Sequence, residues 1–177
     1  MRKIYLTHFV FLASFFIFIS LLKGWFSLVY VPFWIGGLIG VVLPDVDHFI
    51  YIYLMRPQEL TSQRATRLMA SGNIGRTMSL LAETRGERKH LVFHTATFQM
   101  IFIVFAFLII SSSNSLLGRG LVLGFGIHLL IDQLVDIVET ESLDNWFDQI
   151  KITVNKERAL VYWFVNMFII LLFGFLF

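Results

Sequence analysis

Long apolar runs alternate with short polar segments along the chain, and the lengths of the runs match membrane crossings. A helix needs about 20 apolar residues to span the hydrocarbon core of a bilayer. Four runs meet this length, and a fifth does so if polar positions inside a bundle are allowed. Spans are therefore predicted near residues 4–22, 25–46, 91–110, 119–138 and 159–177. The predicted fold is all-α: a single polytopic membrane helix bundle covering residues 1–177.

Composition supports this class and excludes several others. The chain has 177 residues, is 57% hydrophobic and carries a formal net charge of +2. This hydrophobic content is too high for an ordinary soluble domain, and the charge is too small to favour nucleic-acid binding. The absence of cysteine excludes disulfides and thiolate metal sites. The N-terminal "MRK" resembles a signal-peptide start, but no small-x-small cleavage motif precedes Lys23, so the first run is predicted to remain as a helix.

The basic residues are distributed unevenly between the predicted loops. The N-terminus has 2 Lys or Arg residues, loop 55–90 has 7 and loop 139–158 has 3, whereas Lys23 and Arg119 stand alone on the opposite side. The positive-inside rule then places the N-terminus and both long loops in the cytoplasm and the C-terminus outside.

Both cytoplasmic loops contain amphipathic or polar segments. Loop 55–90 includes "QRATRLMA" and "RTMSLLAE", which predict one or two short helices at the membrane interface. Loop 139–158 is polar with aromatic anchors, which suits either a surface-lying helix or contact with another protein. A protein partner or a second copy of the chain could bind through these loops.

A polar hexapeptide, "LPDVDH" (residues 43–48), interrupts the second apolar run. Pro44 cannot donate a backbone hydrogen bond, so we expect the helix to break here. Apolar sequence resumes directly after it, so Asp45, Asp47 and His48 are expected below the membrane surface and turned inward. Ionisable groups at this depth usually mark a partner, a cavity or a metal.

Two further spans carry ionisable residues at the same predicted depth. His90 and His94 are one helical turn apart at the cytoplasmic entrance of the third span. His128, Asp132 and Asp136 follow at i, i+4 and i+8 in the fourth, which places them on one helical face. His8 lies near the cytoplasmic start of the first span and could join them.

This combination predicts a metal site in the cytoplasmic half of the membrane. Asp45, Asp47 and Asp132 lack an equal set of buried Lys or Arg residues, so a cation is expected to balance them. Imidazole and carboxylate ligands suit Zn, with Mn or Fe as alternatives, and one or two ions are possible. The candidate ligands are His8, Asp47, His48, His90, His94, His128 and Asp132.

The motifs also resemble a known family. "LPDVDH", a histidine pair opening the next span, and Gly124, His128 and Asp132 at four-residue spacing are similar to motifs of the YdjM-like family. These are bacterial inner-membrane metal-dependent hydrolases whose founding member is associated with the LexA repressor. The resemblance covers roughly residues 5–136 and implies a multi-pass protein of the bacterial inner membrane.

The middle motif differs from the family pattern. The family usually shows His-Arg-Gly-x-Thr-His-Ser, with four residues between the histidines, whereas "KHLVFHT" has three. His94 and Thr95 fit the second half, but the first histidine of the family falls on Lys89. The family is remotely similar to zinc-dependent phospholipase C and P1-type nucleases, and this resemblance favours phosphorus esters as substrates.

The predicted activity is metal-dependent hydrolysis of a lipid or lipid-linked phosphoester in the cytoplasmic leaflet. Asp45 or Asp136 is the expected general base, and Arg88 is expected to bind the phosphate with other arginines of its loop. Those arginines are Arg64, Arg67, Arg76 and Arg85. Two alternatives remain from sequence: a divalent-cation transporter, and a noncatalytic membrane partner protein with a structural metal.

Overall fold

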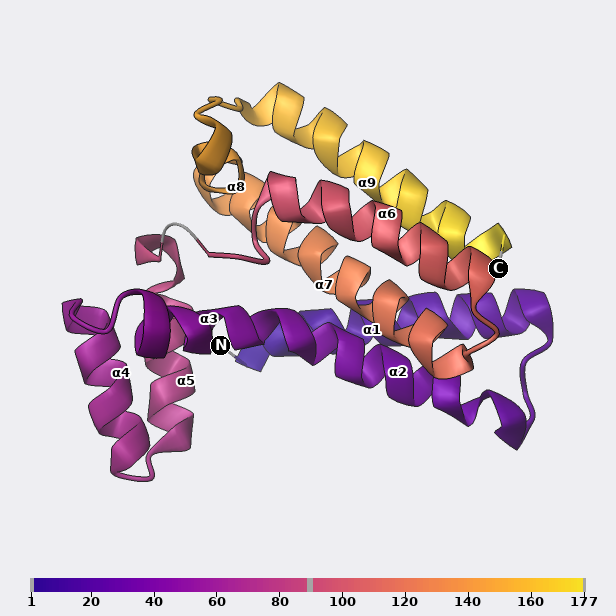
Figure 1. Ribbon diagram of the computed structural model, residues 1–177, viewed down its shortest axis with the longest axis horizontal. Coiled ribbons are helices and arrows are strands. Elements are labelled where there is room, and N and C mark those ends of the chain that lie inside the picture. The colour runs from indigo at the N-terminus through magenta and orange to yellow at the C-terminus, as the bar shows by residue number, and fades with distance from the viewer. Residues whose placement is uncertain (1, 89–90, 177) are drawn as a thin grey trace.

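The computed structural model describes residues 2–88 and 91–176, and these are helical along most of their length (Figure 1). The long helices are α1 (Arg2–Lys23), α2 (Val31–Val42), α6 (Ala96–Ser112), α7 (Leu116–Thr140) and α9 (Lys156–Leu176). The shorter ones are α3 (Val46–Ile50), α4 (Leu60–Ala70), α5 (Ile74–Glu83) and α8 (Asp144–Phe147). Within the described residues the β-structure consists of one isolated bridge, between Ser142 and Asn155. The predicted all-α class is therefore confirmed.

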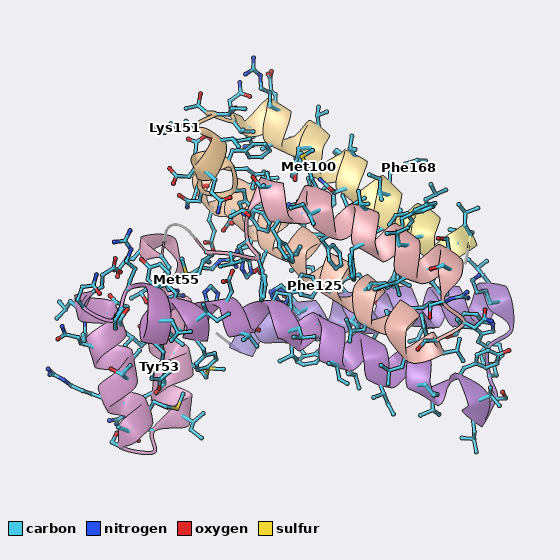
Figure 2. All side chains as sticks on the ribbon, in the orientation of Figure 1. Tyr53, Met55, Met100, Phe125, Lys151 and Phe168 are labelled. Atoms are coloured by element: carbon cyan, nitrogen blue, oxygen red, sulfur yellow. The ribbon has the colours of Figure 1, made fainter. Side chains whose placement is uncertain are left out.

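Four helical stretches are long and apolar enough to cross a membrane, as expected for a polytopic membrane protein. They are Leu6–Lys23, Leu28–Met55, Leu116–Thr140 and Lys156–Leu176. The third predicted span is shorter than expected: α6 has 17 residues, about 25 Å at 1.5 Å per residue. Large apolar side chains on the outer faces of α6 and α9, such as Met100 and Phe168, are exposed and point away from the bundle (Figure 2). Such faces suit contact with lipid.

The second span does not break at Pro44, contrary to the sequence-based expectation. A 3₁₀ turn (Leu43–Asp45) connects α2 to α3, and a π-helical turn (Tyr51–Met55) then carries the chain on to Met55. Because a proline near the start of a turn leaves no unmet donor, the chain can tighten there instead of ending the helix. The helical stretch is longer than predicted, and Asp47 and His48 are buried within it.

Close packing of α2 against α7 positions the two helices that carry most of the polar residues. Gly36 and Gly40 of α2 lie against the backbone of α7 at Leu117 and Leu121, and Gly120 and Gly124 of α7 lie against the backbone of α2 at Phe33 and Gly37. A Cβ atom at Gly40 would lie 2.1 Å from the Leu121 carbonyl oxygen, so only glycine permits this backbone approach. Small residues at four-residue spacing allow such crossings in membrane helices. The crossing brings the backbone of α2 within hydrogen-bonding reach of His128 on α7.

The short helices gather at one end of the bundle. Figure 1 shows α4, α5 and α8 at the end where α6 and α9 begin, opposite the C-terminus. The predicted amphipathic helices of loop 55–90 are therefore present as α4 and α5. The loop after α5 turns back toward α7, and this return brings arginines to the buried polar residues.

Candidate metal centre

One face of α7 carries the residues around which the site is built. His128, Asp132 and Asp136 lie within α7 and follow one another at four-residue spacing, as predicted. His128 and Asp132 are buried, and His128 Nε2 lies 3.2 Å from Asp132 Oδ2. The helix thus presents an imidazole and a carboxylate side by side.

Two more histidines approach the same carboxylate from other helices. His8 of α1 places Nε2 3.1 Å from Asp132 Oδ1, and His94 places Nε2 2.9 Å from Asp132 Oδ2. The ring centroids of His8 and His128 are 4.4 Å apart. We call His8, His94, His128 and Asp132 the His–Asp cluster. In this cluster, ligand atoms of His8, His128 and Asp132 all lie within 4.8 Å of one another, which a single ion could bridge.

The hydrogen bonds of His128 determine which of its nitrogens could bind a cation. Nδ1 lies 2.7 Å from the carbonyl oxygen of Val41, so it must carry the proton and donate it. In the neutral ring Nε2 then carries the lone pair, and among the described residues this atom is buried without a hydrogen-bond partner. Its neighbours are carboxylate oxygens, Asp132 Oδ2 at 3.2 Å and Asp45 Oδ1 at 3.9 Å. The lone pair of a neutral ring and the carboxylate oxygens repel one another, and either a proton on Nε2 or a cation between these atoms removes the repulsion.

Asp47 orients His94 and the chain around it. Its carboxylate lies 3.1 Å from His94 Nδ1 and accepts hydrogen bonds from the backbone N–H groups of Val92, Phe93 and His94. A carboxylate behind a metal-binding imidazole fixes the ring orientation and raises its basicity. Asp47 is completely buried, and these donors satisfy its oxygens.

These hydrogen bonds also explain why the third span begins late. Residues 91–95 are not helical, and α6 starts at Ala96 after Thr95 caps it by accepting a hydrogen bond from Phe98 N. Because these backbone N–H groups donate to Asp47, they are satisfied without the hydrogen bonds of a helical turn. The prediction that His90 and His94 lie one turn apart on a helix is therefore wrong, because His94 precedes α6. His90 lies outside the described residues.

His48 differs from the other histidines because an arginine occupies one of its nitrogens. Arg88 Nε donates to His48 Nδ1 over 3.2 Å, and both side chains are buried. The same guanidinium donates to Thr84 Oγ1 and to the Leu81 carbonyl near the C-terminal end of α5. Arg88 therefore contacts His48 and the end of α5.

Arg85 supplies positive charge to the carboxylates of α7. Its guanidinium lies 2.9 Å from Asp132 Oδ1 and 3.2 Å from Asp136 Oδ1. Burial acts to lower the pKa of Arg85, but the two carboxylates outweigh it and the net pKa shift is upward. Arg85 therefore remains charged. It supplies part of the positive charge that the excess of acidic residues led us to expect from a cation. Asp136 also accepts a hydrogen bond from Trp146 Nε1 at 2.7 Å.

Two small cavities flank Arg85. The first, of about 40 Å³, is lined among others by His8, Asp45, His48 and Asp132. The second, of about 30 Å³, is lined by Arg88, His94, Asp136 and Trp146 among others. Each has room for an ion or a few water molecules but not for a whole lipid.

Most residues selected from the sequence meet at this place, and a few do not. The residues that line the cavities, or that contact residues lining them, are His8, Asp45, Asp47, His48, Arg88, His94, His128, Asp132 and Asp136. The exposed arginines Arg64, Arg67 and Arg76 lie on α4 and α5 and make no contact with the cluster among the described residues. Sequence reasoning missed Trp146, whose only signal was an aromatic residue in a polar loop.

Comparisons of the chain with protein-family models, with curated proteins and with solved structures gave no match. Its function is therefore inferred from the residues of the site.

Proposed function

We propose that the protein is a membrane-embedded, metal-dependent hydrolase. The observation that carries the proposal is the position of His128 Nε2, which among the described residues is buried beside two carboxylates without a hydrogen-bond partner. The proposed ligands are His8 Nε2, His94 Nε2, His128 Nε2 and Asp132. Three imidazoles and a carboxylate suit Zn, with Mn or Fe as alternatives.

Hydrogen bonding at His94 supports the same assignment. Carboxylates approach both ring nitrogens, Asp47 at Nδ1 and Asp132 at Nε2. Such an arrangement is favourable when the ring is an imidazolium or when a cation lies at Nε2. We assign Asp47 the role of orienting His94, because its oxygens already accept hydrogen bonds from the backbone.

The remaining residues can perform the acid–base and binding steps. A bound divalent cation would acidify a water molecule and neutralise charge on the substrate oxygens. Asp45 lies beside His128, lines the first cavity and is partly exposed, so it is the proposed acceptor of the water proton. Asp136 is held by Arg85 and Trp146, which makes it less suited to that role.

The proposed substrate is a lipid or lipid-linked phosphoester of the cytoplasmic leaflet. The basic loops favour a cytoplasmic N-terminus, and we propose that α6 crosses the membrane with its four longer neighbours. Arg85, which lies just after α5, contacts Asp132, so the site lies next to the end of the bundle that carries α4 and α5, the end proposed to be cytoplasmic. Arg85 offers positive charge beside the cavity, and the resemblance to YdjM-like hydrolases of the bacterial inner membrane favours phosphorus esters.

The test compares wild-type protein with His128→Ala, in detergent, by metal analysis and by a screen of phospholipids and isoprenoid phosphates. Wild type is expected to retain a divalent metal and release product, and His128→Ala to lose both while remaining folded. Gln133→Leu is a matched control, since Gln133 is buried on the same helix but contacts α6.

Two results would count against hydrolysis. Equal metal content in wild type and His128→Ala would exclude the proposed ligand set. Metal uptake into vesicles without any lipid product would instead favour a transporter.

A further inference from the structure

His48 was predicted to bind metal, but its hydrogen bond from Arg88 favours another role. A guanidinium N–H can only donate, so the bond from Arg88 Nε requires a lone pair on His48 Nδ1. A neutral ring then carries its proton on Nε2. In this state His48 has no nitrogen free to bind a cation, and Nε2 is a hydrogen-bond donor.

Within residues 2–88 and 91–176 this donor has no protein partner. Among the described residues, no hydrogen bond or ion pair to His48 Nε2 is present, although the side chain is about nine-tenths buried. The ring stacks on His94, with centroids 5.3 Å apart, and lines the first cavity. An N–H on a residue that lines a cavity can donate to an acceptor within it, which a water molecule or a ligand can provide.

The other groups around this cavity indicate what kind of acceptor it takes. Arg85 lies on its wall and carries positive charge, and Asp132 with His8 contributes the proposed metal ligands. With a cation bound, the wall combines two positive centres with one neutral donor. Oxyanions, with several acceptor oxygens on one centre, complement such a set.

We propose that His48 donates a hydrogen bond from Nε2 to an oxyanion of the substrate, the class being a phosphate group. This rests on the proposed function, because the cation is needed to offset Asp45 and Asp132. His48 is thus a substrate-binding residue and Arg88 a positioning residue that fixes its tautomer. Arg88 is itself fixed by Thr84 and the Leu81 carbonyl, so α5 determines the proton position on His48.

The experiment uses zinc-loaded, full-length protein in detergent, titrated with inorganic phosphate and analysed for metal content. His48→Phe keeps a ring on His94 but removes both nitrogens, whereas His48→Gln keeps an acceptor for Arg88 and an amide donor. Both variants are expected to retain the wild-type zinc content. Phosphate affinity should fall at least about tenfold in His48→Phe, as expected for losing a hydrogen bond to a charged group, and should largely return in His48→Gln.

A second pair of variants tests the role of Arg88. Arg88→Met removes the donor to Nδ1, and Arg88→Gln retains one. Phosphate affinity should weaken in Arg88→Met and recover in part in Arg88→Gln, whereas a purely structural role would change only thermal stability.

Several outcomes would overturn the proposal. Loss of zinc in both His48 variants would make His48 a ligand, and equal phosphate affinity in all three proteins would remove its role as donor. Absence of phosphate binding to the wild type would also contradict it. If the wild type binds no zinc, the proposed function fails, but phosphate binding that still weakens in His48→Phe would leave the donor role standing.

Discussion

Two buried polar clusters involve adjacent residues of α7, and they differ in how their buried polar atoms are paired. Asp132 belongs to the His–Asp cluster, while Gln133 belongs to a second set with Gln99, Tyr162 and Asn166, which we call the amide cluster. In the amide cluster, Gln133 Nε2 and Tyr162 Oη both donate to Gln99 Oε1. Asn166 donates to the Tyr162 carbonyl at 2.8 Å. These contacts connect α6, α7 and α9.

The difference lies in the pairing of donors and acceptors. The amide cluster is neutral, and each of these hydrogen bonds joins a donor to an acceptor, although Gln133 Oε1 has no partner among the described residues. In the His–Asp cluster the lone pair of His128 Nε2 faces carboxylates. Neutral hydrogen bonds suffice to hold helices together, whereas buried acceptors that face one another require positive charge, from a protonated side chain or a bound ion. We infer that the first cluster is structural and the second binds a ligand.

Asp132→Asn is expected to have the largest effect. It removes the charge to which three histidines and Arg85 point, so metal affinity should fall by more than about 100-fold, beyond the effect of a residue behind a ligand. Metal titration of the purified protein measures this. Unchanged affinity would show that Asp132 serves Arg85 alone.

Asp47→Asn should have an intermediate effect. The amide can still accept some backbone hydrogen bonds but no longer offers a carboxylate to His94 Nδ1, so metal affinity should fall about 10- to 100-fold. The same titration distinguishes the roles: a loss as large as that of Asp132→Asn would indicate that Asp47 binds metal directly.

Gln99→Leu should have the smallest effect, and only on stability. It leaves the donors of Gln133 and Tyr162 unpaired, at a cost of about 1–2 kcal/mol in the free energy of unfolding. Adding Gln133→Leu should recover part of this loss, because an apolar pair leaves fewer unmet groups. Thermal unfolding in detergent measures both, with metal content as the control. A change in metal content would mean that the two clusters are coupled.

Much of the site could be predicted because its spacing is local. The i, i+4, i+8 pattern of His128, Asp132 and Asp136 needs only the helical period, and α7 bears it out. The glycine pairs at four-residue spacing, Gly36 with Gly40 and Gly120 with Gly124, were a further signal, since they mark close helix packing. The sequence pattern could therefore have identified which two helices cross.

Other features could not be predicted because they depend on contacts between distant segments. Asp47 draws three backbone N–H groups from a segment about 45 residues away, which delays the start of α6. Arg85 reaches Asp132 across 47 positions. No local period encodes such pairings.

By itself, the sequence determined an all-helical fold with helices long and apolar enough to cross a membrane, and the order of the ionisable residues along α7. Apolar run length and helical periodicity are properties of neighbouring residues, which is why these features could be predicted. Only the tertiary structure decided which nitrogen of each histidine is available. Val41 holds the proton on Nδ1 of His128, and Arg88 directs it to Nε2 of His48. A histidine's tautomer follows from the partner that meets it, and here packing between helices supplies that partner.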